Sequence, residues 1–461
     1  MKLVAKFGGS VLRDAEGYSA SAKVVKECVG EGYKVVVVVS AMKGVTDSLL
    51  KVSGSLPKDW KKYVEALKRR HERVLQQLGS SERWFKELEK NVEELKNVLW
   101  ALYILREHTP RTRDFVLSFG ERLSTILMSA ALEREGLNPI PLTPEKAGIF
   151  TDENYNEAVP LYDVIEREVP KRLEPFLEED KVPVVTGFLG STLEGSITTL
   201  GRGGSDLTAT ILGSSLKADE VRLYTDIDGI KTGNPKEFPD AVTIRELSVE
   251  EAIELAHLGA KRLHPRTFEP VLRRHVDVRV LSLYDPKGNN TLISHGRRGP
   301  MLKAVALLNG LAIITVKGVG MVGTKGVAAT VMESVTKVGA NIYAISQPVS
   351  EISISIAVKS SKADLVSNAI RNALEGKGIS VETKIKDNVT AVSVVGRGLE
   401  ELDFVGNVLS LFDNKPVLMV SKGPLDQSLT VLTTNKASRE IGRKIHEKIV
   451  EEMMQYYGEA K

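Results

Sequence analysis

The sequence predicts an α/β domain with a mainly parallel sheet, followed by two smaller α+β domains. One observation is the run "YKVVVVVSAM" (33–42), which is too rich in valine for a surface strand and is typical of a strand buried on both faces. A second is the alternation of strands with helical segments, as in a doubly wound α/β domain. The third is an internal repeat in the C-terminal part. The other main strands are expected at 138–142, 182–188, 219–226 and 276–283.

The elements of the first domain follow from local patterns. Residues 2–7 form the first expected strand. Residues 58–107 contain two charged, amphipathic helical stretches, for which we favour a hairpin packed on the domain over a coiled coil that binds a partner. Residues 113–136 are expected to be helical. Ser248 and Glu251 have the spacing of a capping box and so predict the start of another helix.

The repeat defines the C-terminal part of the chain. Composition shifts at 286–300, which we interpret as a domain boundary. Beyond it, "ITVKGVGM" (314–321) parallels "VSVVGRGL" (392–399), and "ISQPVSEISISIAV" (345–358) parallels "VSKGPLDQSLTVLT" (420–433). Each copy predicts strand, glycine loop, helix, strand, turn, strand and helix, which is a small α+β sandwich. The predicted domains are therefore 1–298, 299–386 and 387–461.

Composition excludes several classes of protein. The net charge is only +3 and no long basic run interleaves with aromatic residues, so we expect no nucleic-acid partner. The longest apolar run, 35–39, is too short for a bilayer, and the N-terminus does not resemble a signal peptide, so we expect a cytoplasmic protein without a membrane partner. The single cysteine, Cys28, excludes an internal disulfide and a multi-cysteine metal site. The histidines have no metal-ligand spacing, and we interpret His264 as structural.

The segment "TTLGRGGSDLTATIL" (198–212) is the main candidate for a binding loop. Three glycines let backbone N–H groups approach a ligand, and Arg202 can bind a carboxylate or a phosphate in bidentate fashion. Asp206 lies where a helix is expected to begin, so the positive end of the helix dipole faces the same space. The structural alternative is a glycine-rich turn with a capping aspartate.

Three further polar loops follow expected strands, and this context favours a ligand site. "KFGGS" (6–10) places Lys6 beside two glycines, like a phosphate cradle, although it lacks the spacing of a P-loop. The other two are "VVSAMKGVTD" (38–47) and "YTDIDGIKTGNPK" (224–236). Because ligands bind at the carboxyl ends of parallel strands, all four loops are expected to meet in one pocket.

A glycine motif in the repeat is a weaker candidate. "GVGMVG" (318–323) matches the dinucleotide fingerprint G-x-G-x-x-G. However, no acidic residue ends the next strand, "NIYAIS" (341–346), and the segment recurs in the second copy. We therefore do not expect a nicotinamide site there.

These motifs resemble those of aspartate kinases, and the resemblance covers nearly the whole chain. "KFGGS", "VVSAMKGVTD", "SFGERLS", "TGFLG", "TTLGRGGSD", "YTDIDGIKTGNPK" and "GAKRLHP" occur in the family's order, ahead of a tandem pair of ACT domains. The resemblance implies an amino-acid-kinase fold, an αβα sandwich around a mainly parallel sheet, with two ferredoxin-like ACT domains. It also implies transfer of phosphate from ATP to the β-carboxylate of L-aspartate, the first step towards lysine, threonine and methionine.

The resemblance also assigns roles to residues. Lys6 would neutralise the transferred phosphoryl group, Arg202 would bind the α-carboxylate of the amino acid, and Glu121 would bind its ammonium group. Lys6 and Asp206 are the implied catalytic residues. The implied substrate-binding residues are Ser40, Thr46, Glu121, Phe188, Arg202, Gly203, Gly204 and Ser205. The implied ATP-binding residues are Lys6, Phe7, Gly8, Gly9, Ser10, Thr225, Asp226, Lys231, Lys236, Lys261 and Arg262. Mg²⁺ would arrive with the nucleotide, and no metal ligand is expected from the protein.

The ACT pair implies feedback by an amino acid and at least a homodimer. The positions that match effector contacts are Met321, Thr324, Val327, Asn341, Ile342 and Gln347. Gln347 is more similar to the threonine-responsive type, whereas Tyr343 replaces an acidic residue of lysine-inhibited members. Two alternatives stay open: a kinase of the same fold for another amino acid such as homoserine, and a non-catalytic amino-acid sensor.

The chain departs from the family pattern in two loops. "KFGGSVL" (6–12) is one residue tighter than the usual "KFGGTSV". "NPK" (234–236) replaces the usual "DPR", and Lys231 stands where an aromatic residue is common. These departures leave the nucleotide preference and the identity of the amino-acid acceptor open, but not the class of reaction.

Overall fold

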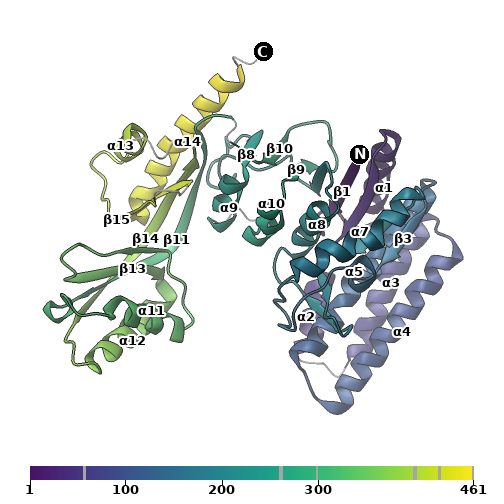
Figure 1. Cartoon of the computed structure of the whole chain (residues 1–461), viewed down its shortest axis with the longest axis horizontal. Helices are drawn as coiled ribbons and strands as arrows, with labels where there is room; N and C mark the ends of the chain where they lie inside the picture. Colours follow the sequence, from purple (N-terminus) through teal and green to yellow (C-terminus); the bar gives the residue numbers. More distant parts are fainter. Residues whose placement is uncertain (55–58, 259–262, 297–298, 398–401, 424–426, 459–461) are drawn as a thin grey trace. The chain divides into compact units, whose positions relative to one another are not determined.

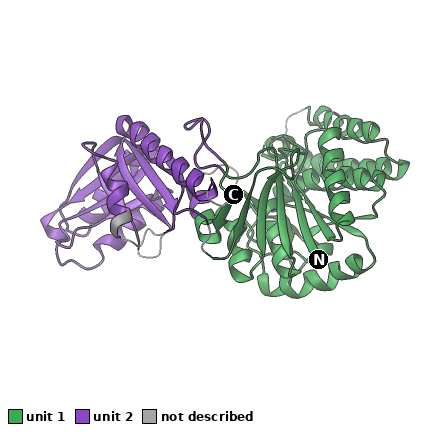
Figure 2. Ribbon diagram, turned by 90° about the horizontal axis from the view of Figure 1, so that it is seen from above, with its two compact units in different colours: residues 1–230, 243–253, 261–298 green, residues 231–242, 254–260, 299–461 purple. Residues whose placement is uncertain are grey.

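The computed structural model describes residues 1–54, 59–258, 263–296, 299–397, 402–423 and 427–458 (Figure 1). The chain forms two compact units, coloured separately in Figure 2. Unit 1 comprises residues 1–230, 243–253 and 261–298, and unit 2 comprises residues 231–242, 254–260 and 299–461.

Within the described residues, unit 1 is built on an eight-stranded sheet with the order β3-β4-β2-β1-β7-β9-β10-β8. The neighbours from β3 to β9 are all parallel, and β10 is antiparallel to β9. In sheet order, the strands are β3 (Pro139–Leu142), β4 (Val182–Thr186), β2 (Lys34–Val39), β1 (Lys2–Phe7), β7 (Glu220–Thr225), β9 (Asp277–Ser282), β10 (Asn290–Ser294) and β8 (Glu246–Ser248). The mainly parallel sheet predicted from the sequence is confirmed.

Helices cover both faces of this sheet (Figure 2). Strand β2 is buried along the valine run, as the sequence predicts for a strand with two covered faces. Leu3, Ala5 and Phe7 pack in one core cluster with the helices α1 (Ala15–Gly30) and α5 (Pro110–Arg134). Helix α8 (Gly204–Ser215) contacts β1, β2 and β7, and it also contacts α7 (Tyr162–Glu178) and α10 (Glu269–Arg273). The result is the predicted αβα sandwich.

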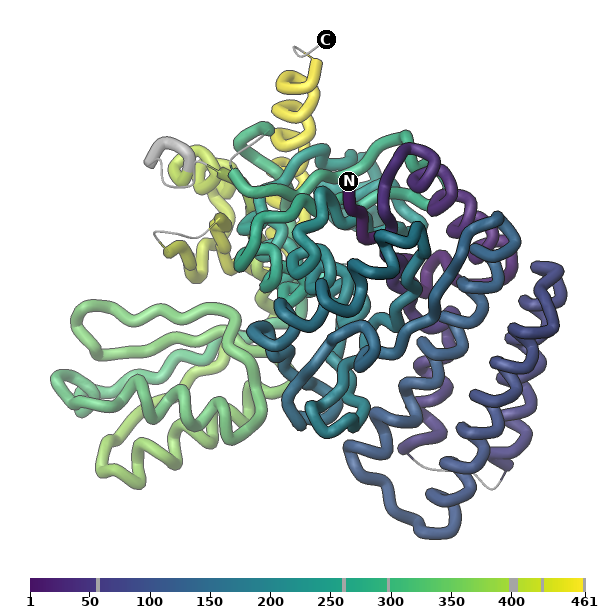
Figure 3. The backbone as a smooth tube through the Cα atoms, turned by 45° about the vertical axis from the view of Figure 1, so that its right-hand side comes forward, coloured from purple at the N-terminus to yellow at the C-terminus, as the bar shows by residue number. Residues whose placement is uncertain are grey.

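Two long helices pack on α5. They are α3 (Trp60–Leu78) and α4 (Glu82–Leu105), which run side by side in Figure 3. Trp60 and Trp84 are almost fully buried in the cluster that also contains α5. The interpretation as a packed hairpin is therefore confirmed. Helix α5 itself is long and apolar enough to cross a membrane, but 89% of its most apolar window is buried, as in a core helix.

The predicted capping box at Ser248 is also present. The backbone N–H of Ser248 donates to Glu251, and the N–H of Glu251 donates to the Ser248 hydroxyl. Helix α9 (Val249–His257) begins here, and the 3₁₀ helix η1 (Pro265–Phe268) begins at the predicted proline. Smaller elements complete unit 1: α2 (Val45–Gly54), α6 (Pro144–Ala147), β5 (Leu189–Ser191) and β6 (Ile197–Thr199).

Unit 2 contains, in its described part, a six-stranded antiparallel sheet with the order β12-β13-β11-β14-β16-β15. The strands are β11 (Leu302–Lys317), β12 (Ala344–Ser346), β13 (Ser353–Lys359), β14 (Glu382–Gly396), β15 (Met419–Ser421) and β16 (Ser428–Thr434). The helices are η2 (Val319–Met321), α11 (Val327–Lys337), η3 (Ser360–Lys362), α12 (Ala363–Glu375), α13 (Leu402–Ser410) and α14 (Asn435–Gly458). Both copies of the repeat thus contribute strands to one sheet.

The two central strands run through both copies. Residues 311–317 of β11 pair with β13 and with 382–389 of β14, whereas residues 302–308 pair with 391–396. The start of β11 therefore pairs with a strand of the second repeat copy, although it comes before the first repeat copy in the sequence. The motif "GVGMVG" lies between β11 and α11, next to antiparallel strands, and so lacks the parallel βαβ setting of a dinucleotide site.

Candidate active site

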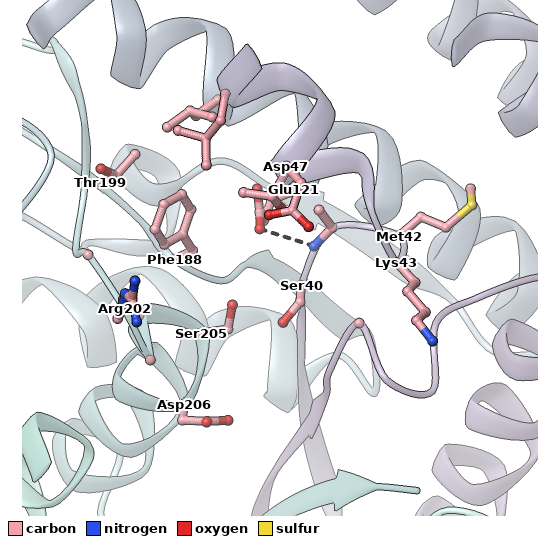
Figure 4. A pocket seen from close by; sticks show the side chains of 18 of the residues that line it. Ser40, Met42, Lys43, Asp47, Glu121, Phe188, Thr199, Arg202, Ser205 and Asp206 are labelled. Atoms are coloured by element: carbon pink, nitrogen blue, oxygen red, sulfur yellow. Dashed lines mark hydrogen bonds between the residues drawn. The ribbon is translucent and has the colours of Figure 1, made fainter. Parts of the chain in front are cut away.

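Unit 1 contains a cavity of about 1160 Å³ at the carboxyl ends of β1, β2, β4 and β7 (Figure 4). All four loops singled out in the sequence contribute to its wall. Three of them follow the parallel strands β1, β2 and β7, which end at the same edge of the sheet, whereas the glycine loop follows β6 of a small two-stranded sheet. The lining residues that the sequence analysis named are Lys6, Gly9, Ser10, Ser40, Thr46, Glu121, Phe188, Arg202, Gly203, Gly204, Ser205, Asp206 and Asp226. The structure brings these residues together, and their individual roles stay predictions.

The glycine loop before α8 requires its glycines. Gly201 and Gly203 have φ angles of 76° and 72°, in the left-handed region. A Cβ atom on Gly203 would lie 2.4 Å from Cβ of His264, and one on Gly204 would lie 2.9 Å from the Phe188 ring. The backbone therefore turns tightly into the first turn of α8, whose N–H groups have no partners within the helix. This is a suitable place for an anionic ligand.

Lys6 and Asp206 form an ion pair at the wall of the cavity. Nζ of Lys6 lies 2.5 Å from Oδ1 of Asp206, and both side chains are mostly buried. A Cβ atom on Gly8 would lie 2.9 Å from the same Nζ, so the glycine leaves room for the ammonium group. The pair fixes a positive charge beside the glycines of the first loop.

Glu121 projects from α5 into the same cavity and is only 3% exposed. Its Oε1 atom accepts a hydrogen bond from the N–H of Ala41 at 3.0 Å. Its Oε2 atom is buried and has no hydrogen-bond partner among the residues that the structure describes. Burial raises the pKa of the Glu121 carboxyl to about 8. The carboxyl is therefore mostly protonated at neutral pH and can ionise when a cation binds.

Arg202 is exposed in the glycine loop, and Figure 4 shows it on the same hollow as Phe188, Ser205 and Glu121. It makes no ion pair or hydrogen bond within the described parts of the chain, so its guanidinium group can bind a ligand carboxylate in bidentate fashion. Arg202 and Glu121 thus offer a cation and an acid to one small molecule. An α-amino acid has the complementary pair of charges.

Some residues assigned to ATP do not line this cavity. Phe7 is buried and stacks on Tyr224 at 4.9 Å, and the Thr225 hydroxyl donates to Asp226. Gly8 does not line the cavity either, and it lies directly beside the ammonium group of Lys6. Lys261 and Arg262 fall outside the described residues.

Lys231 and Lys236 belong to unit 2, in the loop 231–242. That loop is held within its own unit by two contacts of Thr232. Its carbonyl accepts from the N–H of Val305 at 2.9 Å, and its hydroxyl is hydrogen-bonded to Nε2 of His446 at 2.9 Å. No sequence pattern indicates these contacts of Thr232, and the assignment of Lys231 and Lys236 to the nucleotide stays a prediction.

The cavity also contains residues that the sequence analysis did not select. They are mainly polar: Arg13, Lys43, Asp47, Arg113, Asn154, Tyr155, Asn156, Glu157 and Thr199. Arg13 pairs with Asp226 at 2.8 Å. The stretch "DENYNEA" (152–158) is polar and aperiodic, which indicates a loop, but nothing in it indicates which pocket the loop meets.

The residues assigned to an effector lie in the first copy of unit 2. Met321 and Val327 are buried in a core cluster, and Ile342 packs against it. Thr324, Asn341 and Gln347 are exposed. These positions leave the effector role as a prediction.

Replacing Glu121 tests its buried acid. Its folded pKa of about 8 exceeds the ordinary value of 4.5, so between these pH values the unfolded chain loses the proton and the folded chain keeps it. The stability of the wild type should therefore fall by about 1.4 kcal/mol per pH unit over this window, relative to Glu121→Gln. Urea unfolding at several pH values measures the difference. Glu87→Gln, at an exposed position on α4, is the control, and a wild-type-minus-Glu121→Gln difference that does not change with pH would contradict the assignment.

Comparison with known proteins identifies the family. The model of the amino acid kinase family matches residues 1–282, and that of an ACT domain matches residues 314–374. Aspartokinase 2, chloroplastic, of Arabidopsis thaliana is 29% identical over 463 residues, covering 96% of this chain and 83% of the relative. The bifunctional aspartokinase/homoserine dehydrogenase 1, chloroplastic, of Zea mays is 31% identical over 452 residues, covering 93% of this chain. The chain spans about half the length of that bifunctional relative, 48%.

Solved structures agree with these matches. E. coli aspartokinase III in complex with aspartate and ADP is 25% identical, with a TM-score of 0.80 and coverage of 98% of this chain and 100% of that one. The aspartate kinase of Clostridium acetobutylicum, at 19% identity and a TM-score of 0.79, shares the fold. The resemblance to aspartate kinases is thereby confirmed. With the family model matching more than half of its length, the chain belongs to the amino acid kinase family.

Proposed function

We propose that this chain transfers the γ-phosphoryl group of ATP to the β-carboxylate of L-aspartate and forms 4-phospho-L-aspartate. The observation that carries this proposal is the cavity of unit 1. Arg202, Glu121 and the Lys6–Asp206 pair all line this one cavity. The relatives named aspartokinases, and the E. coli enzyme bound to aspartate and ADP, support it.

The acceptor would be held at both charged ends of its α-carbon. Arg202 binds the α-carboxylate, and Glu121 binds the ammonium group and loses its proton as it does so. Thr46 and Ser205 line the cavity and orient the β-carboxylate by hydrogen bonds. That carboxylate is already ionised at pH 7, so the reaction needs no general base. The cavity therefore needs no catalytic histidine.

Transfer requires position and charge more than covalent chemistry. A β-carboxylate oxygen forms the new bond to the γ-phosphorus, the bond from phosphorus to the β–γ bridging oxygen breaks, and ADP leaves with the electron pair. The Lys6 ammonium, held in place by Asp206, and the backbone N–H groups of Gly8, Gly9 and Ser10 neutralise the charge on the transferred group.

Mg²⁺ fits this cavity as a companion of the nucleotide. The described residues contain no group of three side chains that could hold a metal alone, but Asp206 and Asp226 line the cavity. Mg²⁺ is commonly bound by one or two carboxylates together with substrate phosphates. When bound, it would add positive charge at the phosphates.

Unit 2 would regulate this reaction. E. coli aspartokinase III has been solved with lysine and aspartate in a T-state, at 26% identity to this chain. We propose that an amino-acid effector binds at the matched positions of the first ACT copy in a homodimer, and Gln347 favours the threonine-responsive type. The product would enter the synthesis of lysine, threonine and methionine. The plant relatives are named chloroplastic, and a cytoplasmic location stays a prediction for this chain.

An acceptor assay tests the proposal. The purified chain, ATP and Mg²⁺ should produce ADP with L-aspartate and, in the presence of hydroxylamine, the aspartyl hydroxamate. Homoserine is the matched acceptor, since its phosphate ester gives no hydroxamate. If ADP forms with homoserine but not with aspartate, homoserine is the acceptor. If ADP forms with neither amino acid, the result favours a non-catalytic amino-acid sensor.

Arg202→Ala tests the division of roles. Loss of a charge-assisted bidentate contact costs about 2–3 kcal/mol, so KM for aspartate should rise by roughly 30- to 150-fold. KM for ATP should stay within about twofold, because Arg202 is assigned to the acceptor. Arg167→Ala, at an exposed position on α7, is the control and should change neither value. A rise in KM for ATP alone would reverse the assignment.

A further inference from the structure

Asp114 is a fully buried carboxylate near the start of α5, and it does not line the cavity. Its Oδ2 atom accepts hydrogen bonds from the backbone N–H groups of Asn156 at 2.9 Å and Thr199 at 2.8 Å. Its Oδ1 atom accepts from the Thr199 hydroxyl at 2.8 Å. One side chain thus ties together α5, the loop 154–157 and the strand β6.

Both partners of Asp114 lie in the wall of the cavity. Thr199 ends β6 and stands three residues before Arg202, so its position sets where the glycine loop begins. The carbonyl of Thr199 also accepts from the N–H of Ala158, which closes the other side of the loop 154–157. The three hydrogen bonds that Asp114 accepts therefore fix two segments of the cavity wall, the loop 154–157 and the end of β6, relative to each other.

A carboxylate at this buried position needs hydrogen bonds to both of its oxygens. Burying a charge costs free energy unless hydrogen bonds satisfy it, and no ion pair of Asp114 with Lys or Arg occurs among the described residues. An aspartate accepts on both oxygens, whereas an asparagine of the same shape would turn an NH₂ group towards one set of donors. Asn156, whose N–H donates to Asp114, has a φ of 74°, a left-handed conformation that asparagine tolerates better than most residues.

We propose that Asp114 is a positioning residue for the amino-acid acceptor: through Thr199 and Asn156 it holds the start of the Arg202 loop and the facing loop 154–157 in one geometry. This inference rests on the proposed function of the cavity. It acts on the acceptor and not on the nucleotide, because neither partner of Asp114 belongs to the loops assigned to ATP.

Asp114→Asn in the full chain tests the inference. KM for aspartate should rise about tenfold, while KM for ATP should stay within twofold and kcat within about threefold. Ser118→Ala is the matched control. Ser118 is equally buried one turn further along α5, donates to the carbonyl of Phe115 and does not line the cavity.

A second pair of variants tests the route through Thr199. Thr199→Val removes one of the three donors and should raise KM for aspartate about threefold, whereas Thr199→Ser keeps the hydroxyl and should restore it. In the Asp114→Asn background, Thr199→Val should add little, because the two changes break the same contact. If Asp114→Asn does not fold, the Val and Ser variants decide the matter.

The outcomes separate the inference from the proposed function. Suppose that the wild type turns over aspartate and that Asp114→Asn and Thr199→Val both keep KM for aspartate within twofold of the wild-type value. This result overturns the inference about Asp114 but leaves the proposed function intact. Equal rises in KM for aspartate and ATP also overturn it, because they indicate general loss of structure. A wild type without turnover of any amino acid overturns the proposed function and the inference together.

Discussion

The carboxyl group of Glu121 is buried, and among the described residues only one of its two oxygens has a hydrogen-bond partner. The group sits in the middle of α5, the long core helix, and it reaches the end of β2 through the N–H of Ala41. The preceding Gly120 permits this approach, since a Cβ atom there would lie 2.9 Å from Cβ of Ala41. Removing a charge from water without a partner is costly, so the free protein keeps the acid protonated. A ligand ammonium group would complete the site.

The other charges of the cavity complement this acid. Arg202 stands on a glycine loop with a free guanidinium group, while Lys6 is already paired with Asp206. An unpaired cation suits recognition of a carboxylate that arrives with the substrate, and a fixed cation suits charge that develops during transfer. On the proposed function, the cavity would thus separate the binding of the amino acid from the stabilisation of the phosphoryl group. Asp114 would support the first of these two functions.

The sequence was sufficient for the sheet and for the convergence of the loops. Valine-rich strands with polar, glycine-bearing ends predict a parallel sheet with a pocket at one edge, and the structure has both. Glu121 was identified only through the resemblance, because a glutamate within a helical pattern has no signal of its own. Asp114 and the loop 154–157 were missed, since neither glycine nor periodicity marks a residue that acts through tertiary hydrogen bonds. The attachment of the loop 231–242 to α14 was missed for the same reason: His446 lies far from Thr232 in the sequence.

Calorimetry of aspartate binding tests the role of Glu121 most directly. The heat of binding would be measured at pH 7 in two buffers with different enthalpies of ionisation. An acid with a pKa of about 8 is mostly protonated at that pH and must ionise to hold an ammonium group, so close to one proton should be released for each aspartate bound. A heat of binding that is the same in both buffers would mean that no proton leaves, and would contradict ammonium binding by a protonated, buried Glu121.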